Sequence, residues 1–149
     1  MDYSPNVRLE DRLGPNEPPY RSRGEAQVGR LLDRYGIPFF YEMPTVVYDR
    51  GRYRVWRPDF TLPTYQNLIV EYAGMPDKPA YMDGVRYKQG VFRVNATPAL
   101  FVYPMDVKGR SWPYQLAQKI DCLGRSVPRY RHGYIRPYRA RASYRSLGR

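Results

Sequence analysis

The first regular pattern of apolar positions along the chain has the spacing of one helix face. It places apolar side chains at i, i+3, i+4 and i+7, namely Val28, Leu31, Leu32 and Tyr35. Gly36 is suited to end such a helix, because glycine readily adopts the left-handed conformation that follows a last helical turn. The pattern therefore predicts a helix from Arg23 to Tyr35.

Short runs of alternating character follow and predict β-strands. Residues 39–43 and 45–48 are expected to form one bent strand that Pro44 interrupts. Residues 49–52, Asp-Arg-Gly-Arg, have the composition of a hairpin turn, and residues 53–60 are predicted to return as the partner strand.

The second half of the chain predicts alternating strands and helices. Leu68–Tyr72 begins with an uninterrupted apolar run, typical of a strand buried on both faces. Residues 81–94 predict a helix, 99–103 another buried strand, and 113–123 a third helix. The predicted fold class is therefore α/β, in the order helix, three strands, helix, strand, helix.

Length and composition indicate one globular domain with two atypical ends. The chain has 149 residues, of which 42% are hydrophobic, together with 15 Pro and 12 Gly. Residues 1–21 are rich in proline and predict an extended arm, residues 22–123 the folded core, and residues 124–149 a basic tail.

The net charge of +11 is concentrated in that tail. From Gly124 onward there are eight Arg and no acidic residue, which leaves 17 of the 25 basic residues against 14 acidic ones before it. Arginines interleaved with tyrosines favour phosphate contacts and base stacking, although a solubilising tail is the alternative. The arginines expected to bind nucleic acid are Arg129, Arg131, Arg136, Arg139, Arg141 and Arg145.

Several classes of function are excluded by what the chain lacks. A single cysteine, Cys122, and a single histidine, His132 in the tail, exclude an internal disulfide, a His/Cys zinc site and a catalytic core histidine. Neither a Walker-type loop nor a G-x-G-x-x-G motif is present. With no membrane-spanning stretch and no signal-peptide pattern, a soluble protein of the cytoplasm is expected.

Three acidic residues occupy positions where charge is unexpected. Glu71 follows the apolar run 68–70, Asp59 follows Pro58 at the end of the predicted second hairpin strand, and Glu25 lies in the first turn of the first helix. A buried carboxylate is costly unless a cation or several donors meet it. If Asp59 and Glu71 share one sheet edge, clustered carboxylates favour a hard cation, Mg²⁺ or Mn²⁺.

Each acid also has a structural explanation that stays open. Ser22-Arg23-Gly24-Glu25 fits the S-x-x-E capping box, which alone would account for Glu25. Asp59 would serve as a turn residue after a proline, and Glu71 would pair with a distant arginine.

The pattern resembles the PD-(D/E)XK nuclease superfamily over residues 22–105. The most specific pieces are Arg57-Pro58-Asp59-Phe60 and Ile69-Val70-Glu71-Tyr72-Ala73-Gly74, followed by Tyr81 and Lys88. This form is similar to a subgroup with restriction-like and helicase-associated nuclease domains, and in size it is similar to the small Holliday junction resolvases.

The resemblance implies a restriction-endonuclease-like core, in which helices flank a mixed central sheet, and a metal-dependent phosphodiesterase. Asp59, Glu71 and the carbonyl of Tyr72 would bind Mg²⁺, with Mn²⁺ as a substitute. Glu25 would complete the shell directly or through water.

One departure from the family motif bears on catalysis. The motif carries a lysine two residues after the Glu, where this chain has Ala73. Lys88 on the second helix is the candidate replacement, since it is three residues after Val85 and so lies on the inward face. A solvated Lys88 is the alternative, and Arg86 and Lys78 are weaker candidates.

Two functions follow as hypotheses. The first is an endonuclease for branched or structured DNA, acting as a homodimer. The second is a non-catalytic nucleic-acid-binding subunit of a nucleoprotein or mobile-element complex, for which RNA stays open as a partner. The retained acids Glu25, Asp59 and Glu71 favour the first, and Ala73 favours the second.

Overall fold

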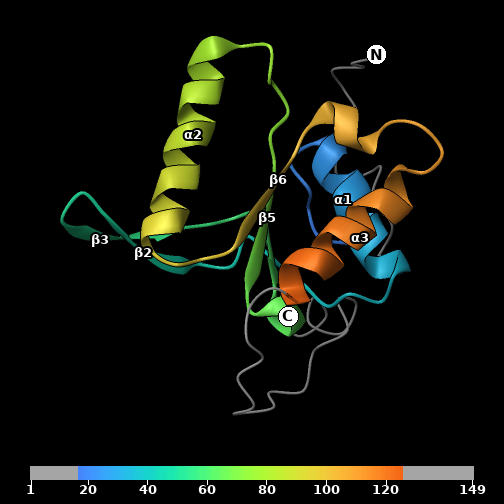
Figure 1. Cartoon of the computed structure of the whole chain (residues 1–149), viewed down its shortest axis with the longest axis horizontal. Coiled ribbons are helices and arrows are strands. Elements are labelled where there is room, and N and C mark those ends of the chain that lie inside the picture. The colour runs from blue at the N-terminus through green and yellow to red at the C-terminus, as the bar shows by residue number, and fades with distance from the viewer. Residues whose placement is uncertain (1–16, 126–149) are drawn as a thin grey trace.

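The structure, a computed structural model, describes residues 17–125. Most of the predicted arm and nearly all of the basic tail lie outside the described residues, as do all six arginines expected to bind nucleic acid. Within the described part, the chain is mixed α/β, as predicted (Figure 1). No helix among these residues is long and apolar enough to cross a membrane.

Helix α1, Arg23–Arg34, forms where the apolar spacing predicts it. The Ser22 hydroxyl accepts the backbone N–H of Glu25 at 3.1 Å and so caps the first turn. Tyr35 ends the helix and Gly36 follows in the left-handed conformation, with φ of 64°. The apolar face of α1 packs against the main sheet.

The main sheet has four strands in the order β1-β4-β5-β6. Strand β4, Phe60–Leu62, runs antiparallel to β1, Phe40–Tyr41, and to β5, Leu68–Tyr72. Strand β6, Ala99–Val102, runs parallel to β5, and helix α2, Pro79–Val94, connects the two. The sheet is therefore mixed, with β6 at one edge.

The predicted single hairpin over residues 39–60 is wrong. Strand β2, Thr45–Asp49, and strand β3, Arg52–Trp56, form a separate two-stranded sheet. The chain leaves the main sheet after β1, where Glu42 has φ of 51° and Pro44 follows, and returns to it past Pro58. Proline cannot donate to a strand ladder, so both crossings occur beside one.

The hairpin turn itself is confirmed. Arg50 and Gly51 both have positive φ, 50° and 76°, as a two-residue turn with right-handed strand twist requires. The outer edge of β2 is occupied at Tyr48, whose N–H and C=O pair with the side-chain amide of Asn95 at 2.8 and 2.9 Å. The hairpin is thereby tied to the C-terminal end of α2.

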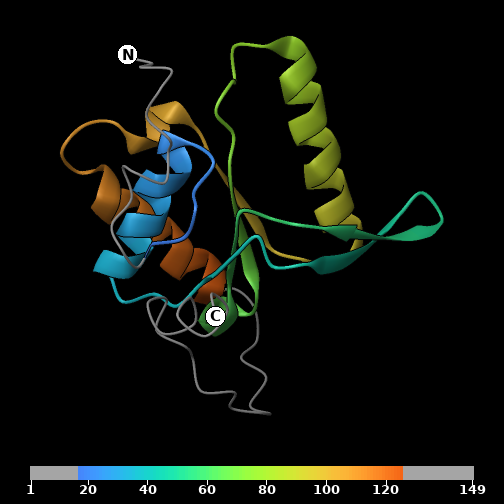
Figure 2. The same ribbon diagram turned by 180° about the vertical axis from the view of Figure 1, so that it is seen from behind.

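Helices cover both faces of the main sheet (Figure 2). Helix α1 and helix α3, Trp112–Arg125, lie on one face, and α2 lies on the other together with the hairpin. Short 3₁₀ turns at Pro63–Tyr65 and Pro104–Val107 complete the connections.

Strand β5 supplies side chains to both apolar layers and is buried on both faces, as its sequence predicts. Leu68 and Val70 join the layer under α1 and α3, and Ile69 joins the layer under α2. Glu71 follows Ile69 by two positions and so faces α2. The sheet thus carries a carboxylate toward a helix that bears lysine.

Candidate active site

Asp59 and Glu71 lie side by side on neighbouring antiparallel strands. Phe60 of β4 pairs with Val70 of β5, so Asp59, just before β4, stands opposite Glu71. The Asp59 Oδ2 atom accepts the backbone N–H of Tyr72 at 2.7 Å.

The expected proximity of these two acids is present, but for a reason that differs from the prediction. Asp59 does not end a hairpin strand; it precedes the first residue of a strand in the other sheet. Antiparallel pairing places the start of β4 beside the end of β5.

Lys88 approaches this pair from α2. Its Nζ atom lies 3.5 Å from Glu71 Oε2, and its side chain is 47% exposed whereas that of Glu71 is 8% exposed. Val85, Val91 and Phe92 of the same helix are buried against the sheet, and Lys88 shares their face. The ammonium group therefore touches the buried acid while remaining open to solvent.

Burial dominates the acidity of the pair. Burial, followed by the negative charge of Glu71, raises the pKa of Asp59 to about 8. Burial also raises the pKa of Glu71, although the Lys88 ammonium offsets part of that rise. Without a metal ion, the Asp59–Glu71 pair is therefore expected to retain a proton at neutral pH.

Glu25 lies near the pair but is engaged elsewhere. Its carboxylate is buried and accepts the Tyr41 hydroxyl at 2.6 Å and the Arg21 N–H at 3.1 Å. Its negative charge contributes to the raised pKa of both Asp59 and Glu71. The capping box is only half formed, because the Glu25 carboxylate binds the N–H of Arg21 rather than that of Ser22.

The close approach of α1 to β5 brings Glu25 to this end of the sheet. A Cβ atom at Gly24 would lie 1.9 Å from the ring of Tyr72, so only glycine allows the contact. The Tyr81 hydroxyl accepts the Gly74 N–H at 3.0 Å and fixes the connection from β5 to α2. Tyr41, which holds Glu25, carries no sequence signal, because its partner lies sixteen residues away.

The two weaker alternatives to Lys88 do not form an ion pair with Glu71. Arg86 pairs with Asp83 at 2.9 Å on an exposed part of α2, and Lys78 is the residue before the helix begins. Among the described residues, Lys88 is the basic side chain that forms an ion pair with Glu71.

The donor set suits a hard cation that is only partly held by protein. No group of three His, Cys, Asp or Glu side chains within residues 17–125 converges as a ready metal site. Magnesium, however, is commonly bound by one or two carboxylates, with waters and substrate phosphate as the other ligands. Asp59 and Glu71 supply two carboxyl groups against a single ammonium group, so a metal cation that replaces the retained proton would balance the second negative charge.

Comparisons of the chain with protein-family models, with curated proteins and with solved structures found no match.

Proposed function

We propose that this chain is a metal-dependent endonuclease with a restriction-endonuclease-like core, which hydrolyses phosphodiester bonds of DNA. The observation that carries the proposal is the buried Asp59–Glu71 pair with the Lys88 ammonium 3.5 Å from Glu71. Paired carboxylates can hold a metal ion that activates water, and a lysine beside them can stabilise the charge that develops on a phosphate.

The roles of the residues follow from their positions. Asp59, Glu71 and the carbonyl of Tyr72 would hold Mg²⁺ or Mn²⁺. The bound ion would supply Lewis-acid activation of the phosphate and a water of lowered pKa. Glu25, held by Tyr41 and Arg21, would act through water from outside that shell.

Lys88 takes the part of the lysine that the family motif has at the position of Ala73. Its half-exposed ammonium group would neutralise negative charge that develops on the phosphate oxygens. In the reaction, water oxygen forms a bond to phosphorus, the bond to the leaving oxygen breaks, and the leaving oxygen takes up a proton. Branched or structured DNA is the preferred substrate class.

A cleavage assay tests the proposal. Labelled single-stranded, duplex, flap and four-way-junction DNA would be incubated with Mg²⁺, Mn²⁺ or EDTA. Asp59→Ala should abolish metal-dependent cutting, and Lys88→Met should slow it by a factor of about 100 or more. Lys119→Met is the matched control, since Lys119 is similarly exposed and lies 3.6 Å from Asp106, outside the site; it should cut at the wild-type rate.

The same assay separates the second candidate function. Ala73 at the motif position favours a scaffold that binds nucleic acid without cutting it. Salt-sensitive binding with no cleavage under either metal would overturn the endonuclease and support that alternative. Equal cleavage by the Lys88 and Lys119 variants would overturn the role of Lys88.

A further inference from the structure

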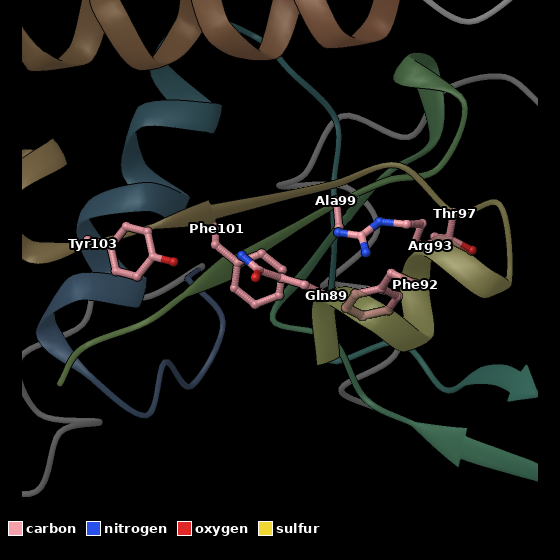
Figure 3. Close-up of a pocket in the computed structure, with 7 residues that line it drawn as sticks. All are labelled: Gln89, Phe92, Arg93, Thr97, Ala99, Phe101 and Tyr103. Atoms are coloured by element: carbon pink, nitrogen blue, oxygen red, sulfur yellow. The ribbon is translucent and has the colours of Figure 1, made fainter. Parts of the chain in front are cut away.

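A pocket of about 440 Å³ opens between α2 and the edge strand β6 (Figure 3). Figure 3 shows Tyr103 at one end, Phe101 and Gln89 in the middle, and Arg93 with Thr97 at the other end. The residues that line the pocket are Gln89, Phe92, Arg93, Thr97, Ala99, Phe101 and Tyr103. Nothing in the proposed chemistry above uses them.

The floor of the pocket is aromatic and its rim is polar. Phe92 and Phe101 belong to the apolar layer under α2, with ring centroids 6.4 Å apart. The side chains of Gln89 and Arg93 stand on the rim, and within residues 17–125 neither forms a hydrogen bond or an ion pair. An amide and a guanidinium group are therefore available to a ligand that covers the aromatic floor.

The pocket adjoins the candidate active site. Phe101 of β6 is the register partner of Glu71 of β5, and neighbouring strands lie about 4.8 Å apart. Both side chains face α2, where Gln89 directly follows Lys88. One ligand could therefore contact the acid pair and the pocket together.

The outer edge of β6, which pairs with no other strand within residues 17–125, adds backbone groups to the pocket. The carbonyl of Pro98 accepts the N–H of Ile69 in β5, and that of Val102 accepts the N–H of Ala73 just after β5. Because bonding alternates along a parallel strand, the N–H and C=O groups of Ala99 and Phe101 point away from the sheet. They offer donors and acceptors at the same place as the aromatic floor.

We infer that this pocket receives an unpaired nucleobase from a strand whose neighbouring phosphate lies at the Lys88 ammonium group, beside Asp59 and Glu71. Bases stack on aromatic side chains whatever their sequence, and an amide such as Gln89 can hydrogen-bond a base edge. Arg93 would bind a flanking phosphate. The inference rests on the proposed function and narrows its substrate to nucleic acid with an extruded or single-stranded nucleotide.

An extended peptide added to β6 fits the pocket less well. Strand addition needs a row of free main-chain groups, and the N–H of Tyr103 is already bound by Asp106 at 2.9 Å. Only Ala99 and Phe101 then present outward groups on this four-residue strand. The positive side chains of Lys88 and Arg93 also favour phosphate.

The test is a binding experiment in EDTA, so that it does not depend on cleavage. Oligonucleotides would carry 2-aminopurine either unpaired in a bulge or paired in a duplex, and fluorescein anisotropy would report binding separately. Wild-type protein should quench the unpaired 2-aminopurine and leave the paired one unchanged. Gln89→Ala and Arg93→Ala should weaken binding of the bulged oligonucleotide by at least about fivefold.

Phe101→Leu keeps an apolar floor without a ring and should remove the quenching, with its fold checked by circular dichroism. Arg34→Ala is the control for loss of one exposed positive charge, on the opposite face of the sheet. Equal quenching in wild type and Phe101→Leu, or equal binding by all variants, would overturn the inference. Binding of an extended peptide in place of the oligonucleotide would also overturn it.

The two proposals fail separately. Quenching without metal-dependent cleavage would retain the base pocket and overturn the endonuclease. Metal-dependent cleavage without quenching would retain the endonuclease and overturn the pocket.

Discussion

Two buried carboxyl groups that lie side by side beneath a helix cannot both be ionised cheaply. Asp59 and Glu71 are in this position, and both have raised pKa values because they are buried. In the metal-bound enzyme a metal cation would balance the charge of the pair. In the metal-free protein the pair keeps a proton instead. The residues proposed for catalysis therefore reduce the stability of the metal-free fold above neutral pH.

Asp59→Asn is expected to stabilise the metal-free protein. The asparagine carbonyl can still accept the Tyr72 N–H, and its amide can donate to Glu71 without adding charge. In EDTA at pH 8 the free energy of unfolding should rise by about 1 kcal/mol or more, while metal-dependent cleavage is lost.

Thermal and urea denaturation would measure this change. Asp83→Asn, which removes an exposed partner of Arg86, should change stability by less than about 0.5 kcal/mol and serves as the control. If Asp59→Asn were less stable than wild type in EDTA, the two buried acids would not be destabilising each other.

At the residue scale, the candidate site can be predicted because Glu71, Asp59 and Lys88 each have an unusual sequence neighbourhood. Glu71 ends an apolar run, Asp59 follows a proline, and Lys88 has the helical spacing of buried residues. Tyr41 and Gly24 do not stand out, because their roles depend on partners that only folding brings near. The same holds for Gln89 and Arg93, which resemble ordinary surface residues in sequence.

At the scale of secondary-structure elements, the sequence predicts the ends of each α-helix to within two residues. It does not predict that the strands divide into two sheets. Residues 53–60 were predicted to form one strand, yet they contribute to β3 in one sheet and to the start of β4 in the other. The prolines mark where the chain breaks, but they do not fix the new partner, because β4 pairs with β1 and β5 across the main sheet. The helices were easier because their spacing, caps and prolines are all local signals.

Helix α2 offers a prediction of its own. Gly84 and Gly90 lie within it, and a Cβ atom added at either position meets nothing within 4 Å. Replacing both with alanine should raise the free energy of unfolding by about 1–2 kcal/mol, since glycine is a poor helix former. Because neither residue contacts the acid pair, the cleavage rate should stay at the wild-type level.

Chemical denaturation and the cleavage assay together would check this result. Gly24→Ala is the informative contrast, because its methyl group would collide with the ring of Tyr72 and force α1 away from β5. It should lower stability where the α2 pair raises it. A double α2 variant that is less stable than wild type would show that α2 is packed differently from the structure.

At the scale of the whole molecule, the acid pair couples stability to pH, and the proposed metal would add a second coupling. The Asp59 pKa is about 8 in the folded protein, above its ordinary value of 3.8. A raised carboxyl pKa stabilises the fold fully below the ordinary pKa, and that contribution is lost as the pH rises through the folded value. Glu71 acts in the same direction.

Metal-free protein should therefore melt at progressively lower temperature between about pH 5 and pH 8. If Mg²⁺ binds the ionised pair, as proposed, the rise in Tm that it causes should grow over the same range. Differential scanning fluorimetry in EDTA and in Mg²⁺ would measure both slopes. Asp59→Asn should flatten both, and an unchanged Mg²⁺ effect in that variant would place the metal elsewhere.

The tie between Asn95 and Tyr48 has a consequence for how the molecule opens. A two-stranded hairpin is seldom stable alone, so β2–β3 depends on its packing against α2. The side-chain amide of Asn95 adds two hydrogen bonds to the backbone of Tyr48. We therefore expect the hairpin and α2 to unfold as one cooperative unit, while Asp59 and Glu71 belong to the four-stranded sheet. Lys88 and the two acids thus lie on different units, and a transient opening of the first would separate the ammonium group from the carboxylates while leaving the rest of the fold intact.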